Sequence, residues 1–323
     1  MESILGQLKF IDRIVIVACG TSYYAGLIGE YLIEELAGIP VEAHLASEFK
    51  YRDEPMSANT AVLAISQSGE TADTIAALKK VENYGVLRIG IVNAVGSTIA
   101  RMTDAGVYCH AGPERAVVST KAFIAQVMVL TLIALHLNDG RTKSFKPLLE
   151  ELNKLPAKAQ AIIDNAEDIK QIAEKYVKYR DFLYIGRHNS YPSAMEGALK
   201  LKEVSYTHAE GYAAGEMKHG PLAMIDKDFP TFAMATNSHL LEKTYSNIQE
   251  IRARGGPVIA IATIGNTDIK DFVDDVIYIP DTLEETQPIL QQIAAQLFAY
   301  YIATARGYDV DHPRNLAKSV TVE

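Results

Sequence analysis

The feature that most constrains the fold of this chain is an internal duplication. A β-branched run, a glycine, a helical stretch, a small-residue turn, a second apolar run, a polar loop, a helix and a third apolar run occur twice in that order. Gly20 and Gly186, which close the first run of each copy, lie 166 residues apart in a sequence of 323. Such a repeat predicts two copies of one domain, and the chain is long enough for two domains of ordinary size.

Each copy has the pattern of an α/β domain. The apolar runs are short and do not alternate with polar residues, which is typical of strands buried on both faces. They cover residues 14–17, 61–65, 88–92, 182–185, 231–235 and 258–261. Helical stretches separate them, so we expect parallel sheets with helices on both faces. The predicted domains are 1–145, 146–307 (with the connecting helices) and a C-terminal tail, 308–323.

The composition excludes some classes of partner. The formal net charge of -9 argues against nucleic acid or an anionic membrane. Two cysteines, Cys19 and Cys109, do not make a disulfide framework. We find no signal peptide and no apolar run of about 20 residues, so we expect a cytoplasmic protein without a membrane partner. Because the net charge is negative, a bound phosphate would have to be held by polar groups close to it in the structure, not by the overall charge of the protein.

The sharpest local signal is a polar loop between a buried strand and a helix. Its candidate ligands are Ser66, Gln67, Ser68 and Thr71. Ligands bind at the carboxyl ends of strands in such sheets, and a helix N-terminus favours an anion. No lysine follows Gly69, so this is not a nucleotide P-loop. A plain helix cap is the alternative, although one residue would suffice for it.

A second loop occupies the matching place after the first strand. Thr21 and Ser22 follow Gly20 there, and their hydroxyls could contact a ligand. A helix cap explains this loop equally well.

A helix of the second copy carries Glu196, Lys200 and Glu203. Their spacing of four and three residues places them on one face. The spacing alone favours a solvated ladder of ion pairs. The alternative is catalytic, because proton transfer between adjacent carbons needs a carboxylate, and an ammonium can tune it or stabilise an enolate.

Two further candidates depend on their surroundings. His219 precedes Gly220-Pro221, so it belongs to a loop, as a surface histidine or as an acid–base group for a sugar ring oxygen. Lys318 lies in the tail, for which a frayed terminus is the simpler interpretation. No spacing typical of metal ligands stands out, and we expect no metal and no cofactor.

Several ordered motifs together resemble one enzyme family over nearly the whole chain. They are residues 18–22 (Ala-Cys-Gly-Thr-Ser), 66–71, 118–123, 196–203, 215–221 and 313–323. The chain resembles the isomerase portion of the glutamine–fructose-6-phosphate transaminases. The resemblance implies two tandem flavodoxin-like sugar isomerase (SIS) domains and a C-terminal tail. It also implies fructose 6-phosphate and ammonia as substrates and a homodimer with a shared active site.

The resemblance further implies a role for each matching residue. Ser66, Gln67, Ser68 and Thr71 would hold the phosphate, and Thr21, Ser22 and Ser119 would bind sugar or phosphate oxygens, with Val117 lining the site and Glu196 as a further polar contact. His219 would open the sugar ring, reaching in from a neighbouring subunit. Lys318 would form an imine with the ketose. Glu203, assisted by Lys200, would move a proton between C1 and C2.

The full-length family enzyme begins with a glutaminase domain that has no counterpart here. We therefore expect ammonia from that missing domain or from outside, with slow isomerisation to glucose 6-phosphate in its absence. Two alternatives share the fold: a non-catalytic sugar-phosphate sensor and a fructosamine-phosphate deglycase. Glu203, His219 and Lys318 together favour the enzyme over the sensor, and the intact tail argues against the deglycase.

Overall fold

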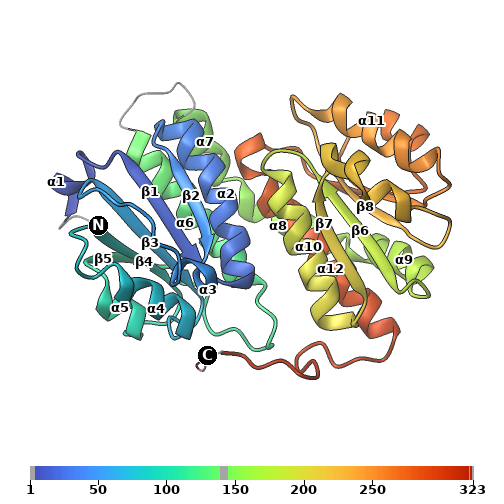
Figure 1. Cartoon of the computed structure of the whole chain (residues 1–323). Helices are drawn as coiled ribbons and strands as arrows, with labels where there is room; N and C mark the ends of the chain where they lie inside the picture. Colours follow the sequence, from blue (N-terminus) through green and yellow to red (C-terminus); the bar gives the residue numbers. More distant parts are fainter. Residues whose placement is uncertain (1–3, 139–144, 320, 322–323) are drawn as a thin grey trace. The chain divides into compact units, whose positions relative to one another are not determined.

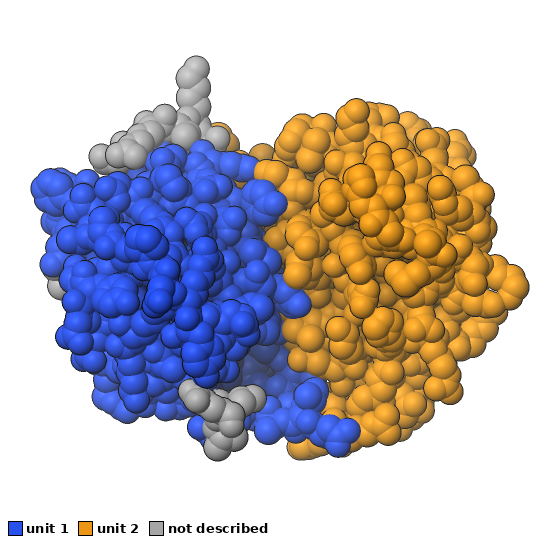
Figure 2. Space-filling model, viewed as in Figure 1, with its two compact units in different colours: residues 1–145, 315–323 blue, residues 146–314 orange. Residues whose placement is uncertain are grey.

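The computed structural model describes residues 4–138, 145–319 and 321, and the chain divides into two compact units (Figures 1 and 2). Unit 1 comprises residues 1–145 and 315–323, and unit 2 comprises 146–314. The predicted tail is therefore shared, with 308–314 in unit 2 and the remainder in unit 1. Tail residues 320, 322 and 323 lie outside the described residues.

Unit 1 is built on a five-stranded parallel sheet in the order β2-β1-β3-β4-β5. The strands are β1 (Arg13–Ala18), β2 (Val41–Leu45), β3 (Thr60–Ser66), β4 (Leu87–Val92) and β5 (Ala105–Tyr108). The helices are α1 (Leu5–Leu8), α2 (Gly20–Ala37), α3 (Ala46–Phe49), α4 (Ala72–Lys80), α5 (Thr98–Met102) and α6 (Lys121–Asn138). This is the strand order of flavodoxin-like folds.

Successive side chains of the buried strands point to opposite faces of the sheet. Val15 and Val17 belong to one core cluster with Leu78 of α4. Ile16 points the other way, because a Cβ built on Gly26 of α2 would lie 2.9 Å from its Cγ2. Helix α2 packs in turn against α6. Apolar side chains on both faces explain why β1 and β3 are continuous apolar runs.

Unit 2 repeats this architecture with the sheet order β10-β9-β8-β6-β7, all parallel. The strands are β6 (Asp181–Gly186), β7 (His208–Ala213), β8 (Thr231–Ala235), β9 (Val258–Thr263) and β10 (Asp275–Ile279). The helices are α7 (Phe145–Leu152), α8 (Leu155–Asp164), α9 (Ala166–Tyr176), α10 (Ser190–Ser205), α11 (Leu241–Arg252) and α12 (Gln287–Ala305), with 3₁₀ segments η2 (Ala214–His219), η3 (Pro221–Met224), η4 (Asp268–Asp271) and η5 (Glu284–Thr286). Helix α10 packs against α12 as α2 packs against α6.

The predicted fold class is confirmed: two α/β repeats, each with a parallel sheet. The sequence patterns located the central strands but not the edge strands β2, β5, β7 and β10. Edge strands are partly exposed, as in Val41–Leu45, where only the first residue is buried, so they lack a continuous apolar run.

Helix α6 is long and apolar enough to cross a membrane by length and composition alone. It was not recognised as such a run in the sequence. Most of it, 61%, is buried inside the structure, and it packs on α2, as the core helix of an α/β domain does.

Candidate functional site

The two polar loops of unit 1 follow neighbouring strands. Ala18 of β1 pairs with Ile65 of β3, so the loops that begin at Cys19 and Gln67 leave the same, carboxyl end of the sheet. In a sheet of this order, ligands bind at the carboxyl ends of the two adjacent strands from which the chain continues in opposite directions. Here these strands are β1 and β3.

Hydrogen bonds within the loop after β3 set its shape. Ser66 Oγ accepts from the N–H of Gly69 at 3.0 Å and lies 3.0 Å from Thr71 Oγ1. Ser68 Oγ accepts from the N–H of Glu70 at 3.1 Å. Thr71 is the N-cap residue of α4, yet its side chain makes no capping bond to the helix. A plain helix cap therefore does not explain why these hydroxyls are grouped here.

Gly69 is required at its position for two reasons. Its φ is +66°, which an L side chain rarely adopts. A Cβ built there would lie 2.0 Å from Ser97 Oγ. The loop can pass close to α5 only because residue 69 has no side chain.

The carboxylate of Glu70 forms a hydrogen bond to a neighbouring helix. Its Oε1 accepts from the N–H of Thr98, in the first turn of α5, at 2.7 Å. This bond lowers the pKa of Glu70, so the carboxylate stays ionised at neutral pH.

A buried glutamine that the sequence analysis did not single out supports the second loop. Gln126 of α6 is fully buried, and its Nε2 donates to Ser22 Oγ at 3.0 Å. Ser22, 7% exposed, is thus held by a helix about a hundred residues further along. The sequence signal for Gln126 was an amide side chain inside a mostly apolar helical stretch. Thr21 is half-buried at the start of α2.

The tail is not simply frayed at Lys318 and Ser319, which contact two segments of unit 1. Lys318 Nζ donates to the carbonyl oxygens of Ala116 and Val117 at 2.7 and 3.3 Å. Ser319 Oγ donates to Ser68 Oγ at 3.4 Å. The structure therefore brings together three sequence-predicted regions: the loop after β3, the segment at Val117, and the tail.

Ser119 lies in that segment, just before α6. Its Oγ is buried and has no hydrogen-bond partner among the described residues. A buried hydroxyl without a partner is costly unless a ligand or water satisfies it.

In unit 2, the charged face of α10 is buried. Lys200 Nζ lies 3.3 Å from Glu196 Oε1 and 2.6 Å from Glu203 Oε2. The side chains of Glu196 and Lys200 are 0% and 2% exposed, and that of Glu203 is 21% exposed. The solvated ladder favoured by the spacing is therefore wrong, because spacing reports which residues share a face but not what covers that face.

The carboxylates control the charge of Lys200. Burial alone would lower the pKa of its ammonium, but attraction to Glu196 and Glu203 outweighs burial and raises that pKa. Lys200 is therefore a permanent cation that can hold Glu203 in place. Glu203 alone of the three is partly accessible to a reactant.

His219 lies on a separate segment of the same unit. It ends the 3₁₀ helix η2 and is exposed, whereas Met217 of that helix is fully buried and anchors it in the core. The turn continues through Gly220, with φ at +144°. The structure presents the His219 side chain to solvent.

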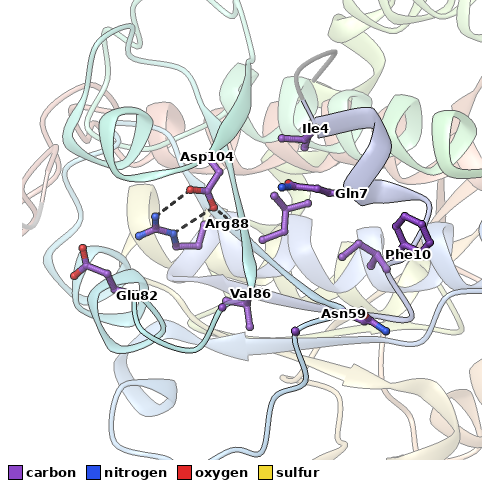
Figure 3. Close-up of a pocket in the computed structure, with 12 residues that line it drawn as sticks. Ile4, Gln7, Phe10, Asn59, Glu82, Val86, Arg88 and Asp104 are labelled. Atoms are coloured by element: carbon purple, nitrogen blue, oxygen red, sulfur yellow. Dashed lines mark hydrogen bonds and ion pairs between the residues drawn. The ribbon is translucent and has the colours of Figure 1, made fainter.

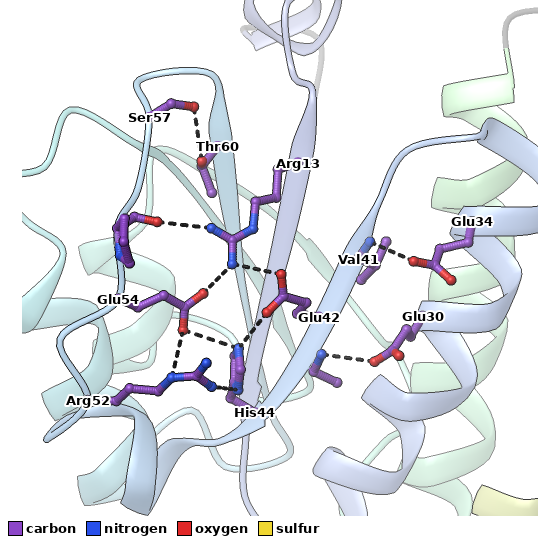
Figure 4. A network of polar contacts seen from close by, with 12 residues as sticks. Arg13, Glu30, Glu34, Val41, Glu42, His44, Arg52, Glu54, Ser57 and Thr60 are labelled. Carbon is purple, nitrogen blue, oxygen red and sulfur yellow. Dashed lines mark hydrogen bonds and ion pairs between the residues drawn. The ribbon is translucent and has the colours of Figure 1, made fainter.

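A further cluster joins β2 to the loop before β3 (Figure 4). His44 Nε2 lies 3.6 Å from Glu42 Oε2 and 3.3 Å from Glu54 Oε2, so three possible metal ligands meet although their spacing in the sequence did not suggest a metal site. Arg13 already pairs with both carboxylates, and Arg52 Nε lies 3.8 Å from Glu54. Two guanidinium groups thus balance the two carboxylates, and we assign this network to the stability of unit 1.

The amino end of the same sheet carries a cavity of about 620 Å³ (Figure 3). Arg88 and Asp104, paired at 3.0 Å, line it together with Phe10 and Asn59. The cavity adjoins the amino ends of β3 and β4. It therefore lies at the opposite end of the strands from the loops that follow β1 and β3.

Comparison with known proteins agrees with this architecture. The SIS domain family matches residues 7–136 and 175–306. A glutamine–fructose-6-phosphate aminotransferase (isomerizing) of Chlorobaculum tepidum is 54% identical over 322 residues, 99% of this chain and 52% of the relative. The same enzyme of Thermus thermophilus is 50% identical over 97% of this chain and 52% of its own length. The chain thus spans about half the length of these relatives.

A solved structure covers the same region. The C-terminal domain of glucosamine-fructose-6-phosphate aminotransferase from Francisella tularensis superposes with a TM-score of 0.92 at 37% identity, covering 97% of this chain and 89% of that one. The chain belongs to the SIS domain family and, within it, to the group of the C-terminal isomerase domain of the glutamine–fructose-6-phosphate aminotransferases.

Proposed function

We propose that this chain converts fructose 6-phosphate to glucosamine 6-phosphate with ammonia, and isomerises it slowly to glucose 6-phosphate when ammonia is absent. The relatives are named for the aminotransferase reaction, and this chain corresponds to about half of their length. Ammonia comes from a glutaminase domain or from solution. The protein acts in the cytoplasm as a homodimer.

The observation that carries the proposal is the position of the tail in unit 1. The amine of Lys318 hydrogen-bonds beside Val117, and the next residue, Ser319, contacts Ser68 in the hydroxyl-rich loop. A nucleophilic amine near an anion-binding loop suits a phosphorylated carbonyl compound.

The loop and its neighbours bind the phosphorylated ketose. Backbone N–H groups at the start of α4 favour an anion. The phosphate is held by Ser66, Gln67, Ser68 and Thr71, while Thr21, Ser22 and Ser119 bind the remaining oxygens beside Val117. The buried Oγ of Ser119 would acquire its partner from the sugar phosphate.

The chemistry needs one amine and one carboxylate. Lys318 attacks C2 of the open-chain ketose and releases water as the imine forms; ammonia then displaces the lysine at C2. Glu203 removes a proton from C1 of the protonated imine, which gives an enolamine, and returns it to C2; the C1 hydroxyl releases its proton to solvent and becomes an aldehyde. Lys200 positions Glu203, and Glu196 holds Lys200.

His219 serves the step before imine formation. Its exposed ring opens the hexose by moving a proton to the ring oxygen, and it acts in a partner subunit of the homodimer. Its exposed position on unit 2 supports this role, because it leaves the imidazole accessible to a second chain.

The test is to follow fructose 6-phosphate by ¹³C NMR, with and without ammonium, and to trap the imine with cyanoborohydride. We expect glucosamine 6-phosphate only with ammonium, slow glucose 6-phosphate without it, and a reduced sugar adduct at Lys318 by mass spectrometry. Lys318→Met should lose the adduct, whereas the control Lys227→Met, at an exposed lysine, should keep it.

The proton-transfer role is tested separately. Glu203→Gln should abolish both products yet still allow the adduct at Lys318, whereas Glu210→Gln, on partly exposed β7, should change neither. Sugar binding without any product in the wild type would indicate a sensor and overturn the proposal. Consumption of fructosamine 6-phosphate in place of fructose 6-phosphate would indicate a deglycase.

A further inference from the structure

Helix α10 ends on a tyrosine whose backbone is strained. Tyr206 follows the last residue of this helix with φ at +56°, and its N–H donates to the carbonyl oxygen of Lys202 at 3.1 Å. Glycine is the usual residue in this left-handed position, and a bulky side chain there is uncommon because it crowds the backbone. The strain indicates that the tyrosine side chain makes a contact that a glycine could not supply.

The strained turn is held on both sides by the end of α12. Arg306 Nη1 donates to the carbonyl oxygen of Ser205 at 3.0 Å and to Thr207 Oγ1 at 2.5 Å. The Nε of the same guanidinium group donates to the carbonyl oxygen of Val177 at 2.9 Å. These bonds fix the backbone on either side of Tyr206 and so hold the turn that presents its ring.

The ring of Tyr206 contacts the first part of the tail. The centroid of the Tyr308 ring lies 4.9 Å from that of Tyr206. The guanidinium carbon of Arg314 lies 4.2 Å from the Tyr206 centroid, within the range of a cation–π contact. The hydroxyl oxygen of Tyr206 also accepts from the backbone N–H of Arg314 at 2.9 Å. One side chain of α10 thus contacts both ends of residues 308–314, all within unit 2.

Residues 308–314 also contain a turn of their own. Asp309 Oδ1 accepts from the N–H of His312 at 3.1 Å and from that of Asp311 at 2.9 Å. These bonds lower the pKa of the Asp309 carboxyl, so the carboxylate that closes the turn stays ionised at neutral pH. The segment that Tyr206 contacts is therefore a formed turn, and its last residue, Arg314, lies four residues before Lys318.

We propose that Tyr206 is a positioning residue for the amine of Lys318, because its contacts with Tyr308 and Arg314 anchor the tail to α10. This inference rests on the imine chemistry of the proposed function. With the anchor, a tether of four residues joins Arg314 to Lys318; without it, the tether begins at Arg306 and has twelve. The local concentration of a tethered group falls roughly as the −3/2 power of tether length, so it drops about fivefold.

The anchor also connects the two reactive groups of the proposed chemistry. Glu203 lies three residues before Tyr206, about one turn earlier on α10. The helix that carries the proposed base therefore carries the residue that holds the root of the amine-bearing tail. Loss of the anchor should slow imine formation without changing how unit 1 holds the phosphate.

The test uses the full chain and two variants without the ring, Tyr206→Gly and Tyr206→Asn. Both new residues suit a left-handed backbone, so both variants should fold. The first readout is the rate at which trypsin cleaves after Arg314, whose side chain the ring covers. The second is the rate of the cyanoborohydride-trapped adduct at Lys318, measured over a range of fructose 6-phosphate concentrations.

We expect both ringless variants to be cleaved faster and to form the adduct about fivefold more slowly at saturating sugar. The sugar concentration that gives half the maximal rate should not change. Tyr206→Phe keeps the ring contacts and loses only the hydroxyl, so it should recover part of the rate. The control Tyr84→Gly removes a 43% exposed ring from unit 1 and should match the wild type in both readouts.

The outcomes separate the two proposals. If the wild type forms no adduct, the proposed function fails and the positioning role with it, whereas faster cleavage of the ringless variants still supports the anchor. If the wild type forms the adduct and both folded ringless variants form it at the same rate, the positioning role of Tyr206 is overturned and the proposed function stands. Unchanged cleavage after Arg314 in these variants would overturn the anchor itself.

Discussion

Lys200 Nζ lies 2.6 Å from Glu203 Oε2 on the buried face of α10, and the two residues differ in exposure. Lys200 is sealed from solvent while Glu203 keeps one-fifth of its side chain exposed. A fixed cation thus holds a partly accessible carboxylate in place, as the proton-transfer role that we propose for Glu203 requires.

Removal of the ammonium should be costly for stability. Lys200→Met leaves Glu196 as a fully buried carboxylate without its cation, and we expect a loss of about 3–5 kcal/mol in the free energy of unfolding. Urea denaturation measures the loss. Glu196→Gln combined with Lys200→Met should recover much of it, because no buried charge remains unpaired. Equal instability of the single and double variants would contradict this explanation.

Gly69 should tolerate no side chain. Gly69→Ala places a methyl group 2.0 Å from Ser97 Oγ at a φ of +66°. The matched control is Gly85→Ala, with φ at +72° and open space around the Cβ, which isolates the cost of the backbone conformation at about 1–2 kcal/mol. We expect Gly69→Ala to cost about 1–3 kcal/mol more than this control, by thermal or urea unfolding. It should also weaken phosphate binding, which the control should not.

Glu30 should make unit 1 less stable as the pH rises. Its Oε2 accepts from the N–H of Ala43 on edge strand β2 at 2.9 Å, and burial raises the pKa of this carboxyl above 4.5. Because the folded state binds this proton more tightly than the unfolded state, the contribution is complete below the unfolded pKa and is lost as the pH rises through the folded pKa.

The test is Glu30→Gln, which keeps an acceptor for Ala43 without a charge. We expect its Tm to exceed that of the wild type at pH 7 and the gap to close near pH 4. Glu34→Gln is the comparison: the Glu34 carboxylate also accepts from a backbone N–H of β2, that of Val41 at 3.0 Å, and its charge helps to raise the pKa of Glu30, so this variant should narrow the pH dependence without removing it. A gap for Glu30→Gln that is independent of pH would show that ionisation of Glu30 is not its cause.

Both thiols should react slowly in the folded protein. Burial raises the pKa of Cys19, which precedes the Thr21–Ser22 loop, and raises the pKa of Cys109 to about 11 from 9.0. At pH 8 the thiolate fraction of Cys109 is then about 100-fold below that of an unperturbed thiol. Iodoacetamide labelling followed by mass spectrometry, with urea-unfolded protein as the control, measures this. Rapid labelling of folded Cys19 would indicate an activated thiol in the first loop.

The sequence by itself determined the fold class. The repeated order of apolar runs and helices, and the glycines 166 residues apart, suffice for two parallel α/β repeats, because strands buried on both faces require continuous apolar runs. It also located the central strands and the polar loop at residues 66–71. These are local properties of consecutive residues.

Only the tertiary structure decided what surrounds those residues. Burial of the α10 face depends on the elements packed over it, so spacing could not separate a solvated ladder from a sealed one. The Gln126–Ser22 bond and the contact of Ser319 with Ser68 join residues 104 and 251 positions apart. No local pattern encodes such pairs, since they form only when the sheet and its covering helices bring distant segments to the same edge.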